Sequence, residues 1–181
     1  MRRTRRIKTS RAAGFTVIEL MLAMFVLTTA VLGGMMMVVM GMARNNSNRV
    51  DTTATNVAQT VLEQIAGVPP NSNPVLTVTD CVPNTLSINT APGGATLKAN
   101  GDVDFTADTA AALNNNQYQM TYTVCGNNGL RTPYDVRWSI QTVGAGGWGK
   151  LVTVSARQPF TATQNGISFI APVTLRTIVS M

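Results

Sequence analysis

Residues 15–43 read FTVIELMLAMFVLTTAVLGGMMMVVMGMA, a run of 29 residues with one ionisable side chain, Glu19, and no proline. The uncharged part, residues 20–43, has 24 residues, and a helix of that length spans about 36 Å. The hydrocarbon core of a bilayer is about 30 Å thick. We therefore expect residues 15–43 to form a transmembrane helix.

The charges around this run predict its orientation. Of the 14 basic residues in the chain, only Arg44 and Arg49 follow the run closely, whereas six precede it: Arg2, Arg3, Arg5, Arg6, Lys8 and Arg11. The positive-inside rule then places the N-terminus in the cytoplasm and the rest of the chain outside. The remaining eight basic residues match the eight acidic ones, so we expect no specific nucleic-acid binding.

The helical pattern continues beyond the apolar run. Apolar residues recur at helical spacing: Val50, Ala54, Val57, Ala58, Val61 and Ile65. This stripe predicts an amphipathic continuation over residues 44–67, in a helix of roughly 50 residues that stops before Pro69 and Pro70. A secretory signal peptide is the alternative, but the apolar run is too long for one and no small-residue cleavage site follows it.

Residues 68–181 have a different composition, rich in Thr, Asn, Val and Gly. Turn signals such as Pro83-Asn84 and Asn100-Gly101 separate segments in which apolar and polar residues alternate. The predicted strands are residues 118–124, 134–141, 150–156 and 173–178. We expect an α+β fold in which an antiparallel β-sheet packs on the second half of the long helix.

The composition excludes several classes of chemistry. The chain has no histidine, so no His-based triad, general base or metal site is possible. Gly144–Lys150 fits the start of a phosphate-binding loop, but Leu151 follows where Ser or Thr is needed, which favours a glycine-rich hairpin. Asp102, Asp104 and Asp108 lack the glycine and glutamate of an EF-hand and favour a polar loop. We expect no enzyme activity, metal or cofactor.

The two cysteines, Cys81 and Cys125, lie 44 residues apart. We expect them to form one disulfide, and two separate buried thiols are the alternative. Outside the cytoplasm thiols tend to oxidise, and a bridge closing this loop would add about 4 kcal/mol of stability on the chain-entropy model.

Glu19 is the most informative residue of the apolar run. A carboxylate in a lipid-facing helix is costly unless it is paired, which makes it a functional hypothesis. The alternative is that Glu19 lies in headgroup water, where the helix N-terminus favours a negative charge.

The stretch Arg11-Ala-Ala-Gly14-Phe15-Thr-Val-Ile-Glu19-Leu20 resembles the processing motif of type IV prepilins and type II secretion pseudopilins. The resemblance implies that residues 1–14 are a basic leader, removed between Gly14 and Phe15 by a prepilin peptidase that also methylates the new amino group of Phe15. It further implies that the helix enters a filament core, where Glu19 pairs with the N-terminal amine of a neighbouring subunit.

The rest of the chain resembles the pilin fold. Residues 51–65, followed by Tyr-x-Val-x-Trp at 134–138 and Lys-x-Val-x-Val at 150–154, resemble minor pilins of the pilus-modification type. The implied function is a structural subunit that acts in pilus assembly or modification. A minor pseudopilin of a type II secretion system is the alternative, and a tip adhesin or DNA-uptake pilin is less favoured.

The resemblance also implies partners and a location. The partners are the prepilin peptidase and methyltransferase, other pilin subunits, the inner-membrane assembly platform and, before assembly, the lipid bilayer. The location is the bacterial inner membrane, with residues 68–181 as a periplasmic head domain, and then a pilus or pseudopilus at the cell surface.

Overall fold

The computed structural model describes residues 14, 16–126, 129–144, 148–159 and 171–180. The chain divides into two compact units, Met1–Asn45 and Asn46–Met181, and each is described by itself.

One long helix, α1, runs from Val17 to Ala66. Its first turn closes on Thr16, whose carbonyl accepts hydrogen bonds from the backbone N–H groups of Glu19 and Leu20. After Ala66 the backbone makes one more turn, from the Gly67 N–H to the Glu63 carbonyl, and two prolines follow. The predicted long N-terminal helix is confirmed.

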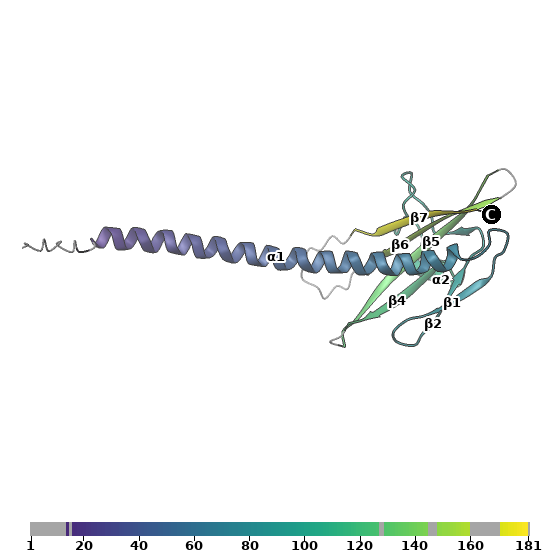
Figure 1. The fold of residues 1–181 in the computed structure, drawn as a ribbon, viewed down its shortest axis with the longest axis horizontal. Helices are drawn as coiled ribbons and strands as arrows, with labels where there is room; N and C mark the ends of the chain where they lie inside the picture. Colours follow the sequence, from purple (N-terminus) through teal and green to yellow (C-terminus); the bar gives the residue numbers. More distant parts are fainter. Residues whose placement is uncertain (1–13, 15, 127–128, 145–147, 160–170, 181) are drawn as a thin grey trace, which may run out of the picture. The chain divides into compact units, whose positions relative to one another are not determined.

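In the second unit, α1 packs with one face against a β-sheet (Figure 1). Five of the six residues in the predicted stripe are buried, and the sixth, Val50, is half-buried against the same core. The buried five are Ala54, Val57, Ala58, Val61 and Ile65. The sheet covers only this stripe because the helix is amphipathic here, with its apolar residues on one face.

The main sheet is antiparallel throughout, and its order is β3-β5-β6-β7, with β4 also paired to β5. The strands are β3 (Gly93–Gly94), β4 (Gln119–Cys125), β5 (Arg131–Val143), β6 (Gly149–Arg157) and β7 (Val173–Ser180). The last four of these correspond to the four strands predicted from the sequence. An α+β fold with an antiparallel sheet is therefore confirmed.

The apolar face of β5 forms the centre of the core. Tyr134, Val136, Trp138 and Ile140 alternate along the strand, and each is at most 2% exposed. The Trp138 indole N–H donates to the carbonyl of Asn89 at 3.0 Å, so its polar atom is satisfied inside the core.

The opposite face of β5 is covered as well, which the alternating pattern did not indicate. Asp135, Arg137 and Ser139 are all buried, beneath residues 95–108, which we call the strap. The strap folds into a small turn through the Leu97–Val103 bridge. Phe105 stacks on two arginines of the sheet, with its ring centre 4.8 Å from the guanidinium carbon of Arg137 and 4.1 Å from that of Arg157.

Four short elements were not predicted: β3, given above, and the three that follow. Strands β1 (Val75–Thr79) and β2 (Thr85–Asn89) form a separate two-stranded antiparallel sheet. Helix α2 (Ala110–Asn115) begins at Thr109, whose side chain accepts a hydrogen bond from the Ala112 N–H. These elements fill the region between the long helix and β4 in sequence.

Candidate functional site

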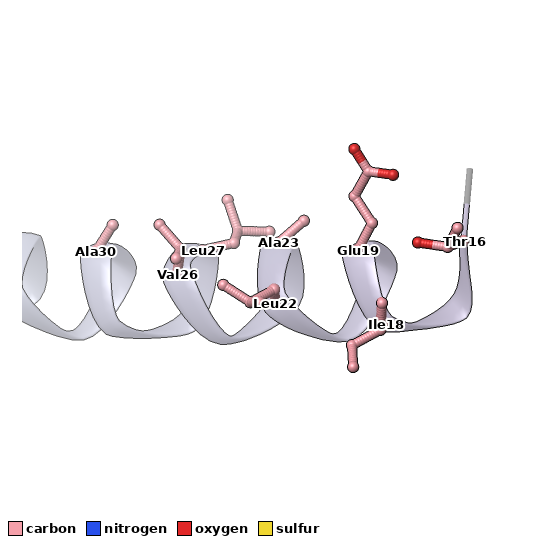
Figure 2. A pocket seen from close by; sticks show the side chains of 8 residues that line it. All are labelled: Thr16, Ile18, Glu19, Leu22, Ala23, Val26, Leu27 and Ala30. Carbon is pink, nitrogen blue, oxygen red and sulfur yellow. The ribbon is translucent and has the colours of Figure 1, made fainter. Parts of the chain in front are cut away.

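Glu19 lies in the first turn of α1. Figure 2 shows its carboxylate projecting from the helix, with Ala23, Leu27 and Ala30 following along the same side. The surrounding side chains are almost all apolar, so Glu19 is a single charge at the edge of a hydrocarbon-like surface. The helix N-terminus carries partial positive charge from its unpaired N–H groups, which favours a carboxylate at this position.

The apolar run that follows is fully exposed. The most apolar 18-residue window of α1 has a mean hydropathy of 2.2, and none of it is buried. The exposed side chains include Leu20, Leu22, Phe25, Val31, Leu32, Met36 and Val39, each at least 51% exposed. By length and composition, α1 is compatible with a single-pass membrane protein.

The polar groups within this run are satisfied by the helix itself. Thr28 and Thr29 donate their hydroxyl groups to the carbonyl of Phe25, at 2.9 and 3.1 Å. Glu19 differs from them, because none of the residues that the structure describes forms an ion pair with it.

The predicted processing site is only partly within the described residues. Gly14 is exposed, and no atom lies within 4 Å of the position that a Cβ would take. Phe15, the predicted methylation site, and residues 1–13 of the predicted leader lie outside the described residues. Cleavage and methylation therefore remain predictions.

Cys81 and Cys125 form a disulfide with a Cα–Cα distance of 5.9 Å. The alternative of two separate thiols is therefore wrong. Beside it, the Asp80 carboxylate accepts hydrogen bonds from the backbone N–H groups of Val82, Asn84 and Thr123. Burial acts to raise the pKa of Asp80, but these hydrogen bonds outweigh it and hold the pKa below its usual value of 3.8. Asp80 and the disulfide together join the β1–β2 turn to β4.

Lys150, the last residue of the apparent phosphate-binding motif, is buried and forms hydrogen bonds within the fold. It lies in β6, is 3% exposed, and donates to the Ser72 carbonyl, the Asn73 side-chain oxygen and the Thr90 carbonyl at 2.7–3.1 Å. Burial lowers the pKa of this amine. The motif joins the paired strands β5 and β6, as expected of a hairpin, although residues 145–147 lie outside the described residues.

The three aspartates of the strap are each held separately. Asp102 pairs with Arg176, Asp104 accepts from Thr106, and Asp108 accepts from the Thr96 N–H. Hydrogen bonds from Thr106, first from its side chain and then from its backbone, lower the pKa of Asp104. In the part of the chain that is described, no group of three or more His, Cys, Asp or Glu side chains could hold a metal ion.

Comparison with known protein families, curated proteins and solved structures found no match. Function is therefore inferred from the residues of this chain and their geometry. Sequence reasoning identified Glu19 and the cysteines, but not Asp80 or the strap. The Pro83-Asn84 turn signal next to Asp80 was the one indication of an ordered turn there.

Proposed function

We propose that this protein is a structural subunit of a type IV pilus, a minor pilin that is processed by a prepilin peptidase and acts in pilus assembly or modification. The observation that carries the proposal is Glu19, a carboxylate in the first turn of a fully exposed apolar helix, without an ion-pair partner among the described residues. The α+β head that follows on the same helix fits this assignment.

The proposed mechanism is assembly. Before assembly the apolar run of α1 lies in the inner membrane, with the head on the periplasmic side. On assembly the run moves into the core of the filament, where the methylated amine of Phe15 in one subunit neutralises Glu19 of its neighbour. Both charges would otherwise remain unpaired in apolar surroundings, which costs several kcal/mol per charge.

The test is to replace Glu19 and measure assembly separately from membrane insertion. We expect Glu19→Ala to remain in the membrane fraction but to be depleted from sheared filaments. Glu63→Ala is the matched control, because Glu63 is an exposed glutamate on the same helix outside the apolar run. Equal recovery of Glu19→Ala and wild type in filaments would contradict the proposal.

The N-terminus of the native protein provides an independent test. A chain that begins at N-methylated Phe15, and that begins at Met1 when the prepilin peptidase is deleted, is the expected result. An uncut chain in the wild-type host would show that the Gly14-Phe15 motif is not used.

A further inference from the structure

Contacts between α1 and the strands show which end of the sheet lies near the start of the second unit. The unit begins at Asn46, and a few residues later the Thr53 side chain lies near the Tyr134 hydroxyl, close to the start of β5. At the other end of the sheet, Lys150 binds the Ser72 carbonyl, just after α1 ends. Residues near Tyr134 and before it in β5 therefore lie at what we call the entry end.

The charges most open to solvent at the entry end are arginines. Arg49 and Arg131 are exposed, and no ion pair of either is found among the described residues. The side chain of Arg157 is 34% exposed, and its Nε is buried with no hydrogen-bond partner there.

The acidic groups at the same end are buried or half-buried, and all of them but Asp51 accept hydrogen bonds or form ion pairs. Asp80 accepts three backbone N–H groups, and Asp135 is buried between Arg137 and Arg157. Asp51 is half-buried near Tyr134, and Asp108, also half-buried, accepts from the Thr96 N–H. The surface that this end presents to its surroundings is therefore basic.

An apolar side chain accompanies these arginines. Leu130 directly precedes Arg131 and is 65% exposed. The turn before it is closed by the Gly126 N–H, which donates to the Leu130 carbonyl. An exposed leucine beside an exposed arginine is the combination that suits the boundary between lipid chains and headgroups.

The position of these residues along the chain matches the headgroup layer. Arg49 follows the last apolar residue of the run, Ala43, by six residues, which is about 9 Å of helix. The headgroup region on each side of the hydrocarbon core is about 5–8 Å deep. A bilayer that contains the apolar run thus has its surface within a few residues of Arg49 along the chain.

We propose that the entry end binds the anionic phospholipid surface of the membrane, with Arg49 and Arg131 on headgroup phosphates and Leu130 at the apolar boundary. This inference rests on the proposed function, since it requires the apolar run to be in a bilayer. It goes further by assigning the head a lipid-binding surface that must be released before the subunit leaves the membrane.

The test uses the full chain in lipid discs of phosphatidylcholine, with or without phosphatidylglycerol. A fluorescent label on Thr121→Cys, an exposed position in β4 that pairs with Asp135, reports energy transfer to a headgroup-labelled lipid. The same label on Gln141→Cys, exposed and further along β5, is the control position. We expect high transfer from position 121 only in the anionic discs, and its loss in high salt because screening weakens the attraction.

The variants distinguish this surface from a general charge effect. Each arginine near an anionic surface favours binding by roughly fivefold, so Arg49→Gln with Arg131→Gln should lower the ratio of bound to free heads about 25-fold. Lys98→Gln with Arg176→Gln removes the same charge from the strap and from β7, and should change the ratio little. Equal effects of the two double variants would overturn the proposal.

Other outcomes are also decisive. Equal transfer in neutral and anionic discs overturns lipid binding, and if Arg49→Gln with Arg131→Gln then lowers recovery in filaments, the arginines belong to a contact with another subunit. Failure of the full chain to enter discs at all would overturn the membrane span, and with it both proposals.

Discussion

In residues 17–43 of α1 no side chain is buried, whereas from Ala54 to Ile65 a buried residue recurs every one to four positions. Both stretches belong to one helix with the same backbone hydrogen bonding. The first is apolar on every side, and the second has a single apolar stripe among Thr, Asn and Gln. A helix that is apolar all round requires an apolar environment on every side, while a striped helix needs only one covered face. The two stretches therefore differ in what covers them: the sheet covers the second, and in the proposed function a bilayer or a filament core surrounds the first.

The largest effect should come from the centre of the covered part. Trp138→Ala removes a fully buried side chain and leaves the Asn89 carbonyl without its donor, so we expect a loss of about 4–5 kcal/mol in the free energy of unfolding. Chemical denaturation of the full chain in detergent would measure it. Trp148→Ala, at a position that is 65% exposed, should change stability little, and a similar loss in both variants would contradict the structure.

Removal of the disulfide should rank next. Cys81→Ser with Cys125→Ser should lower the free energy of unfolding by about 4 kcal/mol on the chain-entropy model for this loop length. The same measurement on wild-type protein with and without a reductant provides the comparison. If reduction leaves the unfolding midpoint unchanged, the bridge does not contribute to stability as inferred.

The sharpest comparison of the two stretches replaces the same residue type in each. Val61 is fully buried in the core, whereas Val31 is 51% exposed. Val61→Ala should destabilise the head by about 2 kcal/mol, and Val31→Ala should not change head unfolding. If Val31→Ala costs as much, the apolar run supports the head directly.

The smallest effect concerns pH and Asp80. Because the folded pKa of Asp80 is lowered, its contribution to stability is present above its ordinary pKa of 3.8 and is lost as the pH falls through the folded value. Asp80→Asn should therefore flatten part of the acid dependence of the unfolding midpoint. An unchanged acid profile in this variant would show that the three backbone hydrogen bonds do not favour the ionised form.

The sequence predicted the long helix and four strands because each has a strong periodic pattern over many residues. It did not predict that Asp135 and Arg137 would be buried, since alternation shows which side of a strand a residue takes and not what lies over that side. The strap that covers them is held by long-range contacts, Phe105 on two arginines and Arg176 on Asp102, which leave no local pattern. Strands β1 and β2 are short and lie beside turns, so their signal was weak.

For the candidate site, Glu19 was predictable because one charge in a long apolar run is conspicuous in any sequence. A disulfide between Cys81 and Cys125 was predicted from their expected location outside the cytoplasm, but the spacing of 44 residues is also compatible with separate thiols. Tertiary structure decides between these, by bringing the β1–β2 turn to the end of β4.

The disulfide also has a mechanical consequence. When the two ends of the chain are pulled apart, tension passes through the sulfur atoms and bypasses the segment between Cys81 and Cys125. The two cysteines are 44 positions apart, so about 150 Å of extended chain cannot be pulled out while the disulfide is intact. β2, the strap and most of β4 thus lie within a closed covalent loop, which a force on the chain ends does not extend.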